Sequence, residues 1–295
     1  MPRNQHLKMW LADHIFIRDA SLSSVEGDPR FTLVSNLRRD TPALYRVRET
    51  LARLYADPEL YSANITQILY GEPFEVHYSD ELFAYGRSLC DGYVGWVLLS
   101  DLTSNWQVPS HLVSAPLAPL YQNPHLKQTS SMLLPMGAMV TTTGTTKNGY
   151  IELECGRWLF AKHVTEKPIN DRSLLDIAKL FIGLPYVWGG RTAMGIDCSG
   201  LLQTSMTLKG LRYHRDSDMQ FKTLGTNVEC LDLQAGDIAF FPGHVGIMVD
   251  EINILHANAT HMAVTIDPLD DVISWVARDT DGAPFLGGKR LAFSQ

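Results

Sequence analysis

The chain has 295 residues, four cysteines and a formal net charge of −7 at pH 7. This length exceeds one ordinary domain, so two or three domains are expected. The acidic balance and the absence of a lysine or arginine cluster argue against nucleic acid or an anionic membrane surface as a partner. Four widely spaced cysteines do not indicate a disulfide framework, and no segment approaches the roughly 18 consecutive apolar residues of a membrane span.

The first 14 residues contain no apolar core of the kind that a secretory signal requires. We therefore expect a reduced protein in the cytoplasm. Residues 1–65 are interpreted as an irregular N-terminal extension that packs on the domain after it. A helical patch is expected within the extension, over residues 43–55, because Leu44, Val47, Leu51 and Leu54 recur at helical spacing.

Two β-rich stretches follow, at residues 66–108 and 111–166. Each contains short apolar or alternating runs that are separated by turn residues. Each also holds a tryptophan, Trp96 or Trp158, five residues before a polar–apolar pair. Two divergent repeats of this kind predict two small β-barrels. An unrelated β-rich extension is the alternative for this region.

The pattern becomes helical near residue 168. The expected elements are a helix capped by Asn170 or Asp171 and ended by Gly183, a helix from Cys198, a short helix from Ser217, strands between 240 and 266, a helix over 268–276 and a last strand over 288–293. Helices followed by an antiparallel meander predict an α+β domain over residues 168–295.

A glycine-rich segment at 186–201 delivers Cys198 to the start of an apolar helical run, for which Gly210 is the expected C-terminal cap. The N–H groups at a helix N-terminus favour negative charge, and the thiolate is the reactive form of cysteine. This context predicts a nucleophile at Cys198. The other three cysteines lack it and are expected to be inert.

Two histidines on consecutive predicted strands are the candidate partners of this thiol. Because side chains alternate along a strand, a turn after residue 249 brings His244 and His256 within cross-strand reach. They suit a base and the group that orients it. Asn258 is a second choice for the orienting group, and His261 is less well placed. Cys198 and the two histidines could instead ligate zinc, but their spacing is not a local zinc pattern, so no metal or cofactor is expected.

Four motifs in order resemble the NlpC-type cysteine peptidases, which cleave the peptides of bacterial cell walls: residues 185–190, 197–200, 236–237 and 244–247. The resemblance covers roughly 168–295 and implies a papain-like fold, with the nucleophile helix on an antiparallel sheet. It maps the nucleophile to Cys198, the base to His244, the third polar residue to His256 and a conserved tyrosine to Tyr186, which would help to stabilise the oxyanion. The β-rich stretches resemble the bacterial SH3-like domains that are often fused to such peptidases.

The resemblance also implies a substrate. Related SH3-fused enzymes hydrolyse the γ-D-glutamyl–meso-diaminopimelate (or lysine) bond in peptides with a free N-terminal L-Ala, so a role in wall-peptide recycling is expected. Ser199 and Ser217 are then candidate substrate contacts. Asp197, Glu72 and Tyr93 are candidates for the amine of L-Ala. The alternative roles are helix capping for Asp197 and ordinary turn and surface chemistry for Glu72 and Tyr93.

Two other functions remain open from the sequence alone. The chain could be a wall-peptide binder without catalysis, or an amidase or acyltransferase on the same fold. The expected partner is a small peptide rather than a macromolecule, and a monomer is favoured.

Overall fold

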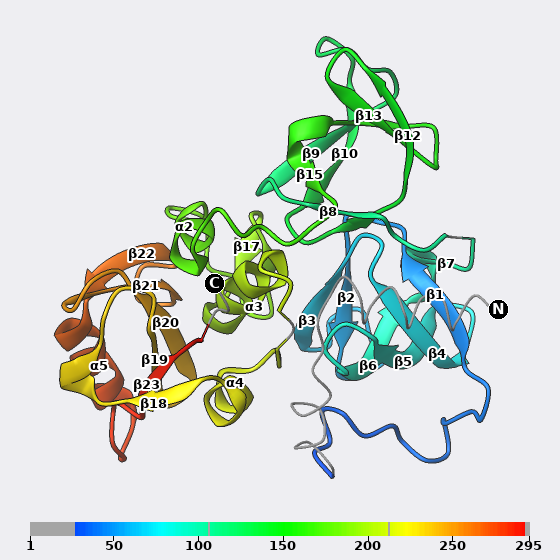
Figure 1. The fold of residues 1–295 in the computed structure, drawn as a ribbon. Helices are drawn as coiled ribbons and strands as arrows, with labels where there is room; N and C mark the ends of the chain where they lie inside the picture. Colours follow the sequence, from blue (N-terminus) through cyan, green and yellow to red (C-terminus); the bar gives the residue numbers. More distant parts are fainter. Residues whose placement is uncertain (1–26, 106, 212, 293–295) are drawn as a thin grey trace. The chain divides into compact units, whose positions relative to one another are not determined.

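The computed structural model describes residues 27–292, apart from residues 106 and 212. Its contacts divide the chain into two compact units. The first unit runs to Ile169 and includes Gly210, and the second begins at Asn170. This confirms the expected multidomain organisation, with strands in the N-terminal half and a mixed domain after it (Figure 1).

A seven-stranded sheet forms the first β domain of the first unit, in the order β3-β2-β6-β5-β4-β1-β7. Its elements are β1 (Ala43–Val47), β2 (Leu51–Tyr55), β3 (Asn64–Leu69), β4 (Pro73–Ser79), β5 (Phe83–Ser88), β6 (Val94–Leu98), a 3-10 turn η3 (Leu99–Asp101) and β7 (Leu102–Thr103). The strands expected between residues 74 and 98 are confirmed.

The helix expected over residues 43–55 is wrong, because this segment forms strands β1 and β2. The apolar residues at helical spacing also fit two short alternating strands on either side of a turn at residues 48–50. β1 pairs with β4, and β2 pairs with β3 and β6, so tertiary pairing decides the conformation. The first β domain therefore begins at Ala43 rather than at residue 66. Residues 1–26 of the expected extension lie outside the described part of the chain.

The second β domain holds two smaller sheets, in the orders β10-β9-β14-β13-β12 and β11-β8-β15. Its elements are β8 (His111–Val113), β9 (Leu117–Tyr121), β10 (Ser130–Pro135), β11 (Met139–Val140), β12 (Thr142–Lys147), β13 (Tyr150–Leu153), β14 (Trp158–Phe160), a 3-10 turn η4 (Ala161–His163) and β15 (Val164–Thr165). In each β domain the tryptophan strand leads into a 3-10 turn and a two-residue strand, as the repeat predicts.

Close backbone contacts join these two β domains. The N–H of Met139 donates to the carbonyl of Tyr70 at 2.8 Å, and Arg46 pairs with Glu154 at 2.6 Å. Gly71 has a φ of +78°, and a Cβ there would come 1.9 Å from the carbonyl oxygen of Met139. Only glycine fits this junction, because it tolerates the left-handed backbone and leaves room for the neighbouring chain.

The second unit is built on a six-stranded antiparallel sheet in the order β18-β23-β19-β20-β21-β22. Its elements are α2 (Leu174–Lys179), β16 (Arg191–Thr192), β17 (Gly195–Ile196), α3 (Cys198–Leu208), α4 (Ser217–Thr223), β18 (Thr226–Val228), a 3-10 turn η5 (Cys230–Asp232), β19 (Ile238–Phe241), β20 (His244–Met248), β21 (Asn253–Asn258), β22 (Ala263–Pro268), α5 (Leu269–Asp279) and β23 (Gly287–Arg290). The expected α+β fold with an antiparallel sheet is confirmed.

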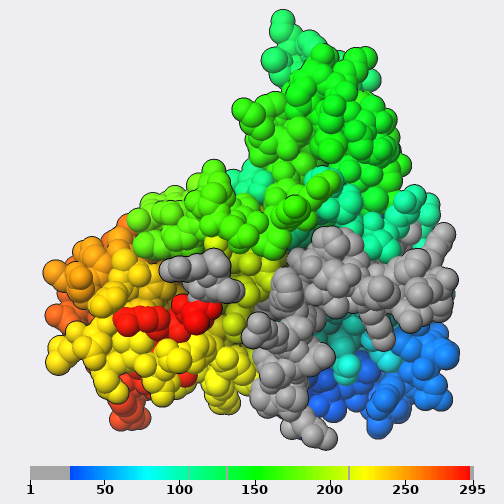
Figure 2. Space-filling model, viewed as in Figure 1, coloured from blue at the N-terminus to red at the C-terminus, as the bar shows by residue number. Residues whose placement is uncertain are grey.

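Helices pack on this sheet from two sides. α3 contacts β20 and β21, whereas α5 contacts β22 and shares an apolar cluster with β19, β20 and β21 (Figure 1). β23 lies between β18 and β19, so residues near the C-terminus are flanked by residues of the 220–240 region on the visible face (Figure 2). The arrangement brings the start of α3 to the same sheet as both candidate histidines.

The first helix of this unit is shorter than expected. Ser173 caps α2, rather than Asn170 or Asp171, and its hydroxyl accepts from the N–H of Asp176 at 3.0 Å. The side chain of Asp176 reaches back to the N–H of Ser173, which completes a capping box. A reciprocal pair of hydrogen bonds outweighs the single cap that Asn170 or Asp171, three or two residues earlier, would offer.

Candidate active site

Cys198 is the first residue of α3, as the sequence predicts. Asp197 precedes it as the N-terminal cap, and its Oδ1 accepts from the N–H of Gly200 at 2.7 Å. The helix ends at Leu208, and Gly210 follows with a φ of +71°. Cys198 is 9% exposed, so its thiol sits at a helix N-terminus that is largely closed to water.

Glycines allow the preceding hairpin to reach the start of α3. A Cβ at Gly200 would come 2.3 Å from the carbonyl oxygen of Gly190. A Cβ at Gly190 would come 2.4 Å from the carbonyl oxygen of Gly195. The glycine-rich pattern before the cysteine is therefore a packing requirement, because any larger residue would push the hairpin of β16 and β17 away from the nucleophile.

A buried guanidinium holds Asp197 in place. The two terminal nitrogens of Arg215 donate to Oδ1 and Oδ2 of Asp197 at 2.9 and 2.6 Å. Oδ2 also accepts from the N–H of Gly189 at 2.8 Å. Arg215 is 1% exposed, so the pair is removed from water and has fixed geometry. The helix-capping alternative for Asp197 is thus present, and its contact with a substrate amine stays a prediction.

The two candidate histidines meet as the strand argument predicts. Nε2 of His244 lies 2.8 Å from Nδ1 of His256, with the ring centroids 5.0 Å apart. β20 and β21 pair Ile247 with Leu255, and a Cβ at Gly246 would come 3.0 Å from the Cβ of His256. The absence of a side chain at Gly246 leaves room beside His256, which is 1% exposed.

Burial controls the ionisation of both catalytic candidates. It raises the pKa of Cys198 to about 12, with a further contribution from Asp197, while the N–H of Val245 and the charge of Arg215 oppose the increase. Burial and the neighbouring His256 lower the pKa of His244 to about 3. The helix N-terminus alone does not offset burial, so the resting thiol of Cys198 and the resting imidazole of His244 are both neutral. Such a site needs a base that takes the thiol proton during attack.

Tyr186 is close enough to Cys198 to interact with it electrostatically. Burial raises the pKa of its hydroxyl, and the nearby Cys198, when it is ionised, and Asp197 add to the increase. The group therefore stays protonated at neutral pH and can donate a hydrogen bond to developing negative charge.

The two serines expected at the substrate come from adjacent helices. Ser199 follows Cys198 in α3, and its Oγ accepts from Arg215 at 2.8 Å. Ser217 begins α4 and is 9% exposed. Gln220 joins the two helices, because its amide donates to the carbonyls of Ser199 and His214 at 3.1 and 2.9 Å. Substrate contact by either serine stays a prediction.

Glu72 and Tyr93 lie in the first unit. Glu72 is 1% exposed, and its Oε2 accepts from the N–H of Leu69 at 2.8 Å. Tyr93 is 1% exposed and packs edge-to-face on Phe31, with ring centroids 5.0 Å apart. Both residues thus contribute to the structure of their own domain, and their contact with the substrate amine stays a prediction.

Sequence reasoning missed two charged residues. Arg215 lies two residues before Ser217, and nothing in the local sequence distinguishes it from a surface arginine. Asp267 lies on β22, and its Oδ2 is 3.0 Å from Nε2 of His256. A signal for Asp267 existed, because Thr265 and Asp267 share one face of a strand that directly follows the strand of His256.

The other cysteines and the possible metal ligands give less support for a functional site than Cys198 does. The remaining cysteines, Cys90, Cys155 and Cys230, form no disulfide bond among the described residues. Within the part of the chain that the structure describes, no cluster of histidine, cysteine and acidic residues is arranged to hold a metal ion. The same described residues include no helix that is long and apolar enough to cross a membrane. The cytoplasmic location expected from the sequence stays a prediction.

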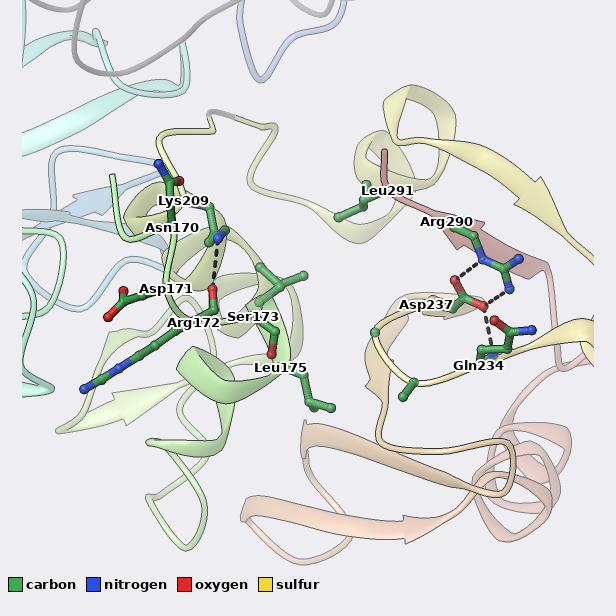
Figure 3. Close-up of a pocket in the computed structure, with 13 residues that line it drawn as sticks. Asn170, Asp171, Arg172, Ser173, Leu175, Lys209, Gln234, Asp237, Arg290 and Leu291 are labelled. Carbon is green, nitrogen blue, oxygen red and sulfur yellow. Dashed lines mark hydrogen bonds and ion pairs between the residues drawn. The ribbon is translucent and has the colours of Figure 1, made fainter. Parts of the chain in front are cut away.

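A pocket of about 650 Å³ lies between α2 and the turn before β19 (Figure 3). Its lining includes Asp237 but not Cys198, His244 or His256. Both oxygens of Asp237 accept from Arg290, at 2.8 and 2.6 Å, and Oδ2 also accepts from the N–H of Gln234 at 2.8 Å. The glycine–aspartate motif at 236–237 therefore fixes the entry into β19.

Two parts of the chain match known protein families. The model of the NlpC/P60 family matches residues 183–277, and that of the bacterial dipeptidyl-peptidase SH3 domain matches residues 54–102. Dipeptidyl-peptidase 6 of Lysinibacillus sphaericus is 29% identical over 243 residues, which cover 75% of this chain and 90% of the relative. A γ-D-glutamyl-L-lysine dipeptidyl-peptidase of Bacillus cereus is 29% identical over 204 residues, which cover 61% of each chain.

A crystal structure of an NlpC/P60 family protein from Bacillus cereus has the same fold, with a TM-score of 0.69 and 23% identity over 84% of this chain and 99% of that one. The SH3 match falls within the sheet of β1–β7, from the end of β2 to the start of β7, and the NlpC/P60 match includes Cys198, His244 and His256. These similarities support a peptidase activity. The chain therefore combines an NlpC/P60 domain with a bacterial dipeptidyl-peptidase SH3 domain.

Proposed function

We propose that the protein is a cysteine peptidase that hydrolyses the γ-D-glutamyl–diaminopimelate (or lysine) bond of cell-wall peptides with a free N-terminal L-Ala. The observation that carries the proposal is Cys198 at the start of α3, next to a sheet on which His244 and His256 are in contact at 2.8 Å. The similarity to a γ-D-glutamyl-L-lysine dipeptidyl-peptidase of Bacillus cereus supports the substrate class.

The reaction begins with proton transfer. Because the resting thiol is neutral, His244 takes the proton as sulfur attacks the γ-carbonyl carbon. The developing oxyanion lies at the N-terminus of α3, where the N–H of Cys198 and the protonated hydroxyl of Tyr186 are its donors. His256 keeps the His244 ring in place throughout this step.

Collapse of the tetrahedral intermediate breaks the carbon–nitrogen bond. His244 then returns the proton to the leaving amine of the diamino acid. The products at this stage are the free diamino acid and an L-Ala-γ-D-glutamyl thioester on Cys198. Water, deprotonated by His244, hydrolyses the thioester and releases the dipeptide L-Ala-γ-D-Glu with a free thiol.

A panel of synthetic peptides tests this function. The full chain is incubated with L-Ala-γ-D-Glu-meso-diaminopimelate, its L-lysine analogue, the α-linked isomer and the N-acetylated peptide. We expect release of L-Ala-γ-D-Glu from the two γ-linked free-amine peptides, and loss of cleavage with the α-linked and acetylated ones. Release of free L-Ala, or equal cleavage of acetylated and free peptides, would contradict the proposal. Transfer of the acyl group to an added amine in preference to water would instead favour an acyltransferase.

A further inference from the structure

Both ring nitrogens of His256 are occupied. Nδ1 lies 2.8 Å from Nε2 of His244, and Nε2 lies 3.0 Å from Oδ2 of Asp267. His256 is 1% exposed, so water does not compete for either nitrogen. A neutral imidazole carries one ring proton, which makes one nitrogen a donor and the other an acceptor. The partner of Nε2 therefore decides whether Nδ1 faces His244 as a donor or as an acceptor.

The two possible tautomers have opposite consequences for the base. If His256 carries its proton on Nε2, its Nδ1 accepts from Nε2–H of His244, and Nδ1 of His244 is left free to accept a proton. If His256 carries its proton on Nδ1, it donates to Nε2 of His244, and Nδ1 of His244 is already protonated. Only the first arrangement leaves a ring nitrogen of His244, its Nδ1, free to act as a base.

Two side chains compete for Nε2 of His256. Asp267 lies at 3.0 Å, and Nδ2 of Asn258 lies at 3.2 Å. A carboxylate only accepts, so it requires a proton on Nε2, whereas the amide nitrogen only donates and requires a bare Nε2. The amide orientation follows from its network, because Oδ1 of Asn258 accepts from the N–H of His261 at 2.9 Å and Nδ2 faces Oγ1 of Thr265 at 2.8 Å.

The surroundings favour an ionised Asp267. Burial alone would raise its pKa, but hydrogen bonds from Thr265 and His256 outweigh burial and place the pKa of Asp267 below its usual range. Its Oδ1 also lies 3.3 Å from Nε2 of His261. Trp275 of α5 stacks parallel to His256 with ring centroids 6.5 Å apart and brings no charge. The amide of Asn258 can direct one N–H to Thr265 at 2.8 Å, and the contact of Nε2 with the charged Asp267, at 3.0 Å, is shorter than its contact with Asn258, at 3.2 Å, so the carboxylate prevails at Nε2.

We propose that Asp267 is a positioning residue: it holds the proton of His256 on Nε2, so that His244 keeps Nδ1 unprotonated and can accept the thiol proton of Cys198. Only the use of this proton arrangement in peptide hydrolysis depends on the proposed function. The arrangement of protons itself can be measured without any substrate.

Nitrogen NMR of the full-length chain tests the proton arrangement directly. Two-bond 1H–15N correlations at pH 7.5 distinguish the two neutral tautomers of each assigned histidine. We expect Nε2–H for both His244 and His256 in the wild type, and loss of that preference in Asp267→Ala. A wild-type His256 with its proton on Nδ1 would overturn the proposal, and this result needs no variant to fold.

Alkylation of Cys198 by iodoacetamide, read by mass spectrometry of its own peptide, gives a second measurement. We expect the rate at pH 7.5 to fall roughly 10- to 100-fold in Asp267→Ala, the range typical for a residue that orients a functional ligand through a hydrogen bond. Asp271→Asn is the matched control, because it removes an exposed carboxylate of α5 on the same unit. Asn258→Ala should lower the alkylation rate less than Asp267→Ala does.

An unchanged alkylation rate in folded Asp267→Ala, or an equal loss in Asn258→Ala, would overturn the positioning role. Failure of the proposed function has a different signature: the synthetic wall peptides would remain uncut while the tautomers and the alkylation rates behave as expected.

Discussion

The two sides of the candidate active site use a carboxylate in different ways. On the nucleophile side, Asp197 pairs with the buried Arg215 and accepts from backbone N–H groups. On the base side, Asp267 contacts two imidazole rings, those of His256 and His261. The first carboxylate is neutralised permanently and fixes backbone geometry. The second acts on groups that exchange protons, so it can control where a proton lies.

The largest loss of activity is expected on the nucleophile side, from replacing Cys198 itself. Cys198→Ala should lower kcat/KM by roughly 10⁴-fold or more, because the roles proposed for His244 and His256 act only through the thiol. The fold should persist, since the change removes one sulfur atom from the start of α3. Peptide cleavage together with a thermal melt checks both points. Retention of a tenth of wild-type turnover would contradict the assignment of Cys198.

The two histidines should differ in their effect. His244→Ala removes the group that moves the proton, and we expect kcat/KM to fall roughly 10²–10⁴-fold. His256→Ala removes an orienting group, and a loss of roughly 10- to 100-fold is expected. Kinetics on one γ-linked peptide compares them. If His256→Ala is the more damaging variant, the two roles are exchanged.

Arg215 separates structure from catalysis on the nucleophile side. Arg215→Met leaves Asp197 buried without its partner, and breaking such a pair costs about 3–5 kcal/mol of the free energy of unfolding. Urea unfolding of the full chain measures this loss. Lys222→Met is the matched control, because Lys222 lies in the exposed α4 pair with Asp218, 3.7 Å away. This variant should lose much less of the free energy of unfolding. Similar losses in both variants would show that the buried pair contributes little.

The base side should be sensitive to acid. The pKa of His244 is lowered from 6.5 to about 3 by burial, and that of His256 is lowered as well. The unfolded chain therefore binds more protons than the folded one below pH 6.5, so this contribution to stability is complete above that pH and is lost as the pH falls.

His244 contributes up to about 1.4 kcal/mol per pH unit in that window, and His256 acts in the same direction. Urea midpoints at pH 7 and pH 5 measure the slope. His244→Asn should show a smaller decrease in midpoint than the wild type. Identical decreases would contradict burial of neutral His244 as a cause of the acid sensitivity.

The sequence predicted the parts of the site that are local in the chain. Cys198 after a capping aspartate, and His244 and His256 on adjacent strands, follow from spacing alone. Arg215 was missed because no periodic pattern links it to Asp197, 18 residues earlier in the chain. Asp267 lies only 11 residues after His256 on the next strand, but strand alternation alone does not distinguish it from an ordinary surface carboxylate. The incorrect prediction of a helix over residues 43–55 also reflects what pairing in the fold adds. The apolar spacing of this segment fits a helix and fits two short strands equally well, and only strand pairing distinguishes them.

The most direct test of nucleophilic catalysis by Cys198 is to trap the intermediate. The full chain is mixed with excess L-Ala-γ-D-Glu-L-Lys, quenched in acid within one turnover and digested for mass spectrometry. We expect the mass of an L-Ala-γ-D-glutamyl acyl group on the peptide that contains Cys198, and no such mass on the peptides of Cys90, Cys155 or Cys230. Product release with no acyl group on Cys198, or an acyl group on another cysteine, would contradict this mechanism.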